Sequence, residues 1–191
     1  ALVSADPCYG GCDVATKDAE LLGMDLVVHY GHTPFWAEKP LNVIYVEARA
    51  KIDVNGALEK ALPLLKPYRR IGLVSVVQHL HEVENVRQRL TQLGKEVYVG
   101  KASGRVTYDG QILGCDYTTA KSIQDRVDVF LYVGGGTFHP MGLVLETGKP
   151  VIAADPYMNE ASDLTSIGLK TLKRRQAEVA KVAEAKRIGL V

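Results

Sequence analysis

The sequence predicts an α/β fold made of repeated parallel-sheet domains, and three observations support this prediction. Short apolar segments rich in β-branched residues alternate with amphipathic segments along the 191 residues. Matching motifs recur in the same order and at equal spacing. Hydrophobic residues make up 47% of the chain and charged residues 24%, as in an ordinary globular protein.

The apolar segments predict strands that are buried on both faces, as in a parallel sheet. They are residues 41–46, 71–77, 97–99, 129–133 and 151–154.

The segments between these strands predict helices. Apolar residues fall on one helical face in residues 58–65 and again in residues 83–93, where Leu93 completes the face and Gly94 is expected to end the helix. Residues 141–147 predict a further helix. Residues 174–186, rich in Ala, Glu and Lys, predict a helix near the end of the sequence.

One short sequence occurs twice in the chain. Residues 70–74 (RIGLV) recur as residues 187–191, at an offset of 117 residues. By this spacing we expect three units: residues 1–66 as the later part of a first domain, residues 67–170 as a complete second domain, and residues 171–191 as a linking helix and the first strand of a third. The alternative is a single two-unit domain whose last strand only resembles residues 71–74.

A second repeat involves two cysteines. Cys12 and Cys115 are each followed by a helix-like segment, an aspartate, a strand and a glycine. Gly31 lies 19 residues after Cys12, and Gly134 lies 19 residues after Cys115. This agreement in order and spacing argues for duplicated units.

Composition excludes several classes of protein. Lys and Arg number 23 and Asp and Glu 22, so a formal charge of +1 gives no general attraction to nucleic acid or to an anionic membrane. No apolar run approaches the roughly 18 residues that span a bilayer. Three cysteines do not make a disulfide framework, so we expect a reducing, cytoplasmic compartment.

The duplicated cysteines are the first candidates for chemistry. Functional loops gather at the carboxyl ends of parallel strands, so two domains facing a common axis bring Cys12 and Cys115 together. Thiolates are soft ligands that suit zinc or iron–sulfur clusters. The alternative is that small buried cysteines simply pack. The spacing of Cys8 and Cys12 could suggest a two-ligand motif, but Cys8 has no counterpart in the middle unit and is not expected to be a ligand.

The glycine segment is the second candidate. Gly134, Gly135 and Gly136, followed by His139, come after a predicted strand. Glycines let backbone N–H groups approach a ligand, and a helix start favours an anionic group such as a carboxylate. A glycine turn without a binding role remains open. The sequence contains no dinucleotide-binding or P-loop glycine motif.

Other polar residues end predicted strands and are weaker candidates for the same cleft. His29 and His32 occupy the matching position in the first unit and could bind substrate or donate hydrogen bonds. The remaining candidates, which could equally cap helices or form turns, are His79, His81, Asp6 and Asp155.

Four ordered motifs, residues 4–13 (SADPCYGGCD), 29–32 (HYGH), 112–115 (ILGC) and 134–139 (GGGTFH), resemble those of the archaeal diphthamide-biosynthesis enzymes, the 2-(3-amino-3-carboxypropyl)histidine synthases. The resemblance runs over essentially the whole chain. It implies three repeated α/β domains related by a pseudo-threefold axis in the complete protein. Each domain would donate one cysteine to a central [4Fe-4S] cluster.

By this resemblance Cys12 and Cys115 are the first two cluster ligands, and the third lies outside the sequence. The open iron would bind S-adenosylmethionine, and an electron would release a 3-amino-3-carboxypropyl radical and methylthioadenosine. The radical would attack C2 of a histidine of translation elongation factor 2. Gly134, Gly135, Gly136 and His139 are then expected near this cosubstrate. The resemblance also implies a homodimer and an electron donor, which the sequence does not identify.

Two alternatives remain. One is an iron–sulfur dehydratase of the quinolinate-synthase type, in which the cluster acts as a Lewis acid. The sequence contexts of Cys12 (YGGC) and Cys115 (LGC) favour the diphthamide enzyme. The other is a catalytically silent subunit that supports an active partner, and the presence of both cysteines argues against it.

Overall fold

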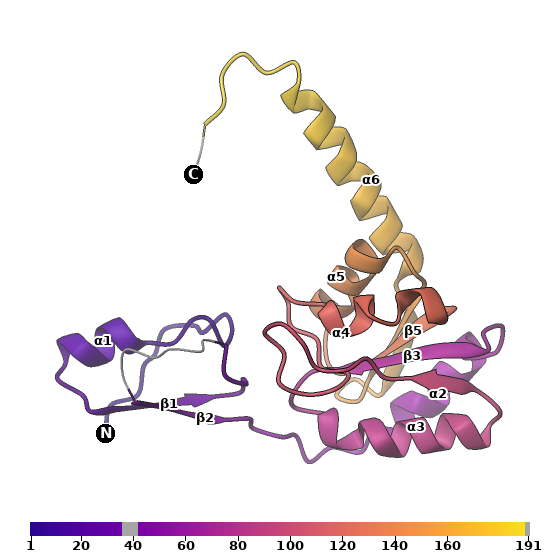
Figure 1. The fold of residues 1–191 in the computed structure, drawn as a ribbon, viewed down its shortest axis with the longest axis horizontal. Helices are drawn as coiled ribbons and strands as arrows, with labels where there is room; N and C mark the ends of the chain where they lie inside the picture. Colours follow the sequence, from indigo (N-terminus) through magenta and orange to yellow (C-terminus); the bar gives the residue numbers. More distant parts are fainter. Residues whose placement is uncertain (36–41, 190–191) are drawn as a thin grey trace.

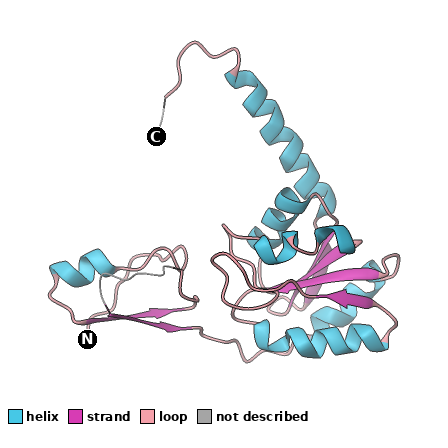
Figure 2. Cartoon of the chain, viewed as in Figure 1, coloured by secondary structure: helices cyan, strands magenta, loops and turns pink. Residues whose placement is uncertain are grey.

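The computed structural model describes residues 1–35 and 42–189, and its mixed helix and sheet architecture with parallel strands confirms the predicted fold class. A small N-terminal unit contains a two-stranded sheet, and a larger unit contains a five-stranded sheet (Figure 1). A long helix, α6 (Thr165–Val182), extends away from the larger unit (Figure 2).

The N-terminal unit consists of α1 (Thr16–Leu21), β1 (Leu26–Tyr30) and β2 (Asn42–Val46). The two strands pair in parallel. Strand β2 confirms the predicted strand from residue 42 onward, and Leu41 lies outside the described residues.

The prediction that every strand is buried on both faces is wrong for this unit. Val28 on β1 is 48% exposed and Ile44 on β2 is 51% exposed. Two strands and one short helix provide too few layers to cover both faces of the sheet.

The second unit holds a sheet in the order β4–β3–β5–β6–β7. Its strands are β3 (Arg70–Ser75), β4 (Glu96–Tyr98), β5 (Val129–Val133), β6 (Val151–Asp155) and β7 (Glu160–Asp163). The first four are parallel, and β7 is an antiparallel edge strand. Strand β5 has the predicted bounds, and β7 was not predicted because its residues are polar and mostly exposed.

Helices cover both faces of this sheet. One face packs against α2 (Asn55–Leu65) and α3 (Val83–Gln92), and the other against α4 (Thr118–Lys121) and α5 (Phe138–Thr147). Successive residues of β5 alternate between the two cores, with Leu131 in the first and Phe130 and Tyr132 in the second. The apolar run of β5 is therefore explained by burial on both sides.

The predicted helical faces are confirmed with one exception. Leu58 and Leu65 on α2 and Leu90 on α3 are buried in the first core. Leu93 is 46% exposed, so its placement on the buried face is wrong. Helix α3 ends at Gln92, and Gly94 takes a φ of +79°, which turns the chain away.

Two helices differ from the expected bounds. Helix α5 begins at Phe138 rather than at residue 141, so His139 lies in its first turn. Helix α6 begins at Thr165, nine residues before the predicted helix 174–186, and ends at Val182. Its Gly168 packs closely against Val144 of α5, where any side chain would collide with the valine.

The structure bears on the proposed units in two places. Helix α2, which the repeat spacing assigns to the first unit, packs against β6 and β7 of the second sheet. Ile188 and Gly189 follow α6 without strand structure, and Leu190 and Val191 lie outside the described residues. Within the described ranges, no helix combines the length and apolar character needed to cross a membrane.

Asp128 connects the start of β5 to the start of β3. Its carboxylate accepts the Arg70 backbone N–H at 2.8 Å and the Arg70 guanidinium at 2.6 Å and 3.1 Å. These hydrogen bonds lower the pKa of Asp128 to about 2. The pair fixes the register of the two central strands from their amino ends.

We expect Leu131→Ala to lower the free energy of unfolding by about 2–5 kcal/mol, because it opens a cavity at a fully buried site of the central strand. Leu93→Ala, at an exposed helix end, is the control and should change stability by less than about 0.5 kcal/mol. Urea denaturation followed by circular dichroism measures both values. Equal losses in the two variants would contradict the assignment of β5 as the centre of the core.

We expect Asp128→Asn to destabilise the protein at pH 7 and to have a progressively smaller effect in acid. A carboxyl pKa that is depressed in the folded state stabilises the protein above the unfolded value of about 3.9, and this contribution is lost as the pH falls toward the folded value. Urea denaturation of wild type and variant at several pH values from 7 toward 3 measures the difference. A difference that does not change with pH would show that the charge of Asp128 does not contribute.

Candidate functional site

Cys12 and Cys115 occupy equivalent four-residue turns. In residues 10–13 and in residues 113–116, the last three residues read Gly-Cys-Asp. The N–H of the last residue donates to the carbonyl of the first, at 2.9 Å in the first turn and 3.4 Å in the second. Each turn therefore presents its cysteine at the same position.

The elements that follow the two turns also correspond. The first turn leads into α1, β1, Gly31 and β2, and the second into α4, β5, Gly134 and, after α5, β6. In both units the two strands are parallel neighbours. The duplication read from the cysteine and glycine spacing is thus present in the order of the elements.

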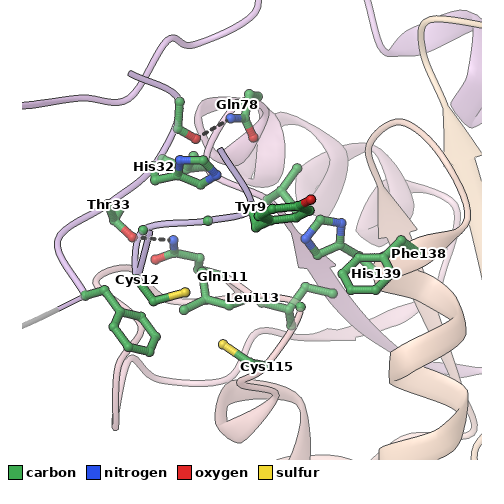
Figure 3. A pocket seen from close by; sticks show the side chains of 18 residues that line it. Tyr9, Cys12, His32, Thr33, Gln78, Gln111, Leu113, Cys115, Phe138 and His139 are labelled. Atoms are coloured by element: carbon green, nitrogen blue, oxygen red, sulfur yellow. Dashed lines mark hydrogen bonds between the residues drawn. The ribbon is translucent and has the colours of Figure 1, made fainter. Parts of the chain in front are cut away.

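Both cysteines line one hollow between the two units, with a volume of about 380 Å³. Figure 3 shows the side chains of Cys12 and Cys115 extending into it from opposite walls. The other labelled residues in its walls are Tyr9, His32, Thr33, Gln78, Gln111, Leu113, Phe138 and His139.

Glycines allow each cysteine turn to pack closely against a neighbouring segment of its own unit. A Cβ at Gly11 would lie 2.7 Å from the carbonyl oxygen of Thr33. A Cβ at Gly114 would collide with the Phe138 ring. Larger residues at these two positions would push the neighbouring cysteines out of place.

Gln111 joins the two units at the floor of the hollow. It is fully buried, and its Nε2 donates to Thr33 Oγ1 at 2.9 Å. Its Oε1 accepts the backbone N–H groups of Thr107 and Tyr108 at 2.9 Å and 3.1 Å. One side chain therefore holds the loop of residues 107–111 against the first unit.

Further contacts reinforce this joint. Gln78 Nε2 donates to the carbonyl of Gly31 at 2.6 Å. The Arg105 guanidinium lies 5.1 Å from the centre of the Phe35 ring, in cation–π geometry. The sequence patterns did not reveal Gln78 or Gln111, because a lone amide residue in a loop carries no periodic signal.

His139 lies beside the hollow with a neutral side chain. Burial lowers its pKa, and the charge of His32 acts in the same direction. The His139 ring stacks on Tyr132, with centroids 6.2 Å apart and planes 16° apart. Burial also lowers the pKa of His32, against a hydrogen bond to the Tyr30 backbone that raises it. Both shifts favour the neutral form of these two histidines.

The three glycines of the predicted loop do not line the hollow. Gly134 donates its N–H to the Ala154 carbonyl at 3.0 Å, and Gly136 donates to Asp155 Oδ2 at 2.9 Å. Gly136 has a φ of +72°, which favours glycine. Gly134, Gly135 and Gly136 form the turn that leads into Phe138 and His139, and their nearness to a cosubstrate stays a prediction.

The other candidates are placed as follows. His32 lines the hollow, whereas His29, His79, His81, Asp6 and Asp155 do not. His79 is buried edge-on against the Tyr157 ring, and neither of its ring nitrogens has a hydrogen-bond partner among the described residues. Asp155 caps the turn after β6 by accepting the N–H groups of Tyr157 and Met158.

The donors in the hollow fit a soft-metal centre. Cys12 and Cys115 are solvent-accessible thiols outside any disulfide, held on glycine turns that leave space in front of them. Thiolates are the ligands of iron–sulfur clusters, and the uncharged histidines nearby do not oppose a bound cation.

Comparison with known proteins gives curated relatives along the whole chain. A 2-(3-amino-3-carboxypropyl)histidine synthase of Pyrococcus horikoshii is 36% identical over 186 residues, which cover 96% of this chain and 52% of that protein. The synthase subunit 1 of Gallus gallus is 31% identical and covers 100% of this chain and 46% of its own length. The chain thus spans about half the length of these relatives.

Solved structures and a protein family agree with these relatives. Crystal structures of Dph2 from Pyrococcus horikoshii, one of them with a 4Fe-4S cluster, superpose with a TM-score of 0.85 at 33% identity. They cover 97% of this chain and 53% and 54% of the solved chains. The family described as "Putative diphthamide synthesis protein" matches residues 1–191. Because the family matches residues 1–191 and a curated relative is 36% identical over 96% of the chain, the chain belongs to the diphthamide synthesis protein family.

Proposed function

We propose that this chain forms part of a 2-(3-amino-3-carboxypropyl)histidine synthase that acts in diphthamide biosynthesis. Its substrates would be S-adenosylmethionine and a histidine of translation elongation factor 2. The observation that carries the proposal is that Cys12 and Cys115, about 100 residues apart in sequence, line one hollow. The relatives named above and the cluster in one Dph2 structure support it.

In this proposal Cys12 and Cys115 would hold a [4Fe-4S] cluster together with a third cysteine from outside residues 1–191. When bound, such a cluster supplies an electron and an open iron, which together release a 3-amino-3-carboxypropyl radical from S-adenosylmethionine. The role of the described residues is to position the cosubstrate and to exclude water from it.

The walls of the hollow suit a sulfonium ion that carries an apolar chain. Burial lowers the pKa of His32 and of His139 and so favours their neutral forms, which would not repel the positive sulfur. The rings of Phe35 and Phe138 provide apolar surface on two walls. We propose that Gly134, Gly135 and Gly136 act by setting the turn that directs Phe138 and His139 toward the cosubstrate.

The resemblance to the archaeal enzymes extends the proposal to partners and location. We propose a homodimer, a separate protein as electron donor, and a cytoplasmic setting.

The reaction is tested by its products. The native protein that carries residues 1–191, reconstituted anaerobically with iron and sulfide and reduced with dithionite, should convert S-adenosylmethionine to methylthioadenosine. With elongation factor 2 present, one histidine of that protein should gain the 3-amino-3-carboxypropyl group by mass spectrometry. The control omits dithionite.

Other products would reject the proposal. Formation of 5′-deoxyadenosine would show cleavage of the wrong sulfur–carbon bond. A cluster that forms but yields no methylthioadenosine would favour a Lewis-acid dehydratase. Failure to form any cluster would favour a silent subunit.

The ligand assignment is tested by substitution. We expect Cys115→Ser to remove most of the iron and the cluster absorbance from the reconstituted native protein. Because Cys115 is exposed, the same change in protein without a cluster should cost less than about 0.5 kcal/mol of stability. Cys8→Ser is the matched control and should keep its iron. Unchanged iron in Cys115→Ser, or equal losses in both variants, would contradict the assignment.

A further inference from the structure

A second group of potential metal ligands lies behind the turn that carries Cys12. Cys8 Sγ lies 4.0 Å from His29 Nε2, and His29 Nε2 lies 3.0 Å from His32 Nδ1. These three atoms all lie within 4.8 Å of one another. The three residues come from two separate segments of the N-terminal unit.

Local structure explains why the three side chains meet. His29 lies near the end of β1, and Gly31, with a φ of +89°, reverses the chain so that the His32 ring returns toward His29. Cys8 Sγ contacts the carbonyl oxygens of Gly10 and Asp13 at 3.5 Å and 3.4 Å. The thiol is thereby held beneath the turn of residues 10–13.

Two of the three ligand distances lie close to those of a tetrahedral zinc site. Zinc–sulfur bonds of about 2.3 Å and zinc–nitrogen bonds of about 2.05 Å place two nitrogens about 3.4 Å apart and a sulfur and a nitrogen about 3.6 Å apart. The observed 3.0 Å and 4.0 Å are each within about 0.5 Å of these values. A small movement of the exposed Cys8 side chain would complete the geometry.

The three side chains also have suitable donor atoms. A neutral imidazole offers one nitrogen lone pair to a metal, so His29 and His32 can each supply one ligand. Cys8 would bind as a thiolate and release its proton to solvent.

This group is distinct from the pair of cysteines in the hollow. Cys8 and His29 do not line the hollow, although Cys12 in the same loop does. Only His32 borders both places, since its ring lines the hollow and its Nδ1 lies near His29 Nε2. A metal bound to these three residues would hold the turn that carries Cys12 in place from the side away from the hollow.

We propose that Cys8, His29 and His32 bind a zinc ion that fixes the turn of residues 10–13 to the end of β1. A sulfur and two imidazole nitrogens in this arrangement are a typical zinc donor set, and the fourth position would be taken by water. Cys8 would then be a metal ligand, contrary to the expectation from the sequence, because its partners are two histidines of its own unit rather than a repeated cysteine. The inference is independent of the proposed catalytic activity.

The test measures zinc in protein that cannot bind metal at the hollow. The Cys12→Ser, Cys115→Ser double variant of the native protein should bind one zinc ion per chain, by mass spectrometry of the metal and by competition with a chromogenic chelator. Cobalt in place of zinc should give tetrahedral d–d bands and a thiolate charge-transfer band. Zinc should also raise the melting temperature.

Substitutions in the same background identify the ligands. Cys8→Ser should weaken zinc binding by about 100-fold or more, because loss of a mere hydrogen-bond partner of a ligand already costs about 10–100-fold. Cys8 is exposed, so this variant does not threaten the fold. His29→Gln should have a similar effect, whereas His81→Gln, at a histidine far from β1 in sequence, should have none.

Two results would overturn the proposal. They are a double variant that binds no zinc, and a Cys8→Ser variant that keeps both zinc and the cobalt charge-transfer band.

Discussion

The hollow depends on two glutamine side chains that hydrogen-bond across the junction of the units. Gln111 is fully buried and satisfies both ends of its amide, and Gln78 reaches the carbonyl of Gly31. A buried amide left without partners costs about 1–3 kcal/mol, so these bonds favour one docking of the two units over nearby alternatives. The opposition of Cys12 and Cys115 follows from that docking, because neither cysteine turn belongs to a shared sheet.

The duplication is closest in the cysteine turns and weakest in the layers around them. In both turns the aspartate after the cysteine accepts backbone N–H groups, from Tyr9 at Asp13 and from Arg105 and Thr118 at Asp116. The second unit covers its sheet with helices on both faces, whereas the described residues of the first unit add only α1 beside β1 and β2. The geometry that the two units share most closely among the described residues is that of the loop that presents the sulfur.

Local patterns predicted the parts of the fold that local chemistry determines. The uninterrupted apolar run of β5, the buried face of α2 and the helix stop at Gly94 depend on residues within a few positions of one another. Strand β7 and the start of α6 were not predicted, because a polar edge strand and the contact of Gly168 with Val144 depend on tertiary neighbours.

The candidate site, like the fold, was predicted only where a sequence pattern expresses it. The equal spacing of Cys12 and Cys115 carried enough information to place both in one site. The glutamines at the junction and the meeting of Cys8 with two histidines depend on chain reversals, such as the one at Gly31, that spacing does not express.

Any bond network that joined the sulfurs of Cys12 and Cys115 would close a loop of about 100 residues. Such a closure reduces the chain entropy of the unfolded state by an amount worth about 4–5 kcal/mol in the loop-entropy model, so the same atoms would serve as a long-range cross-link.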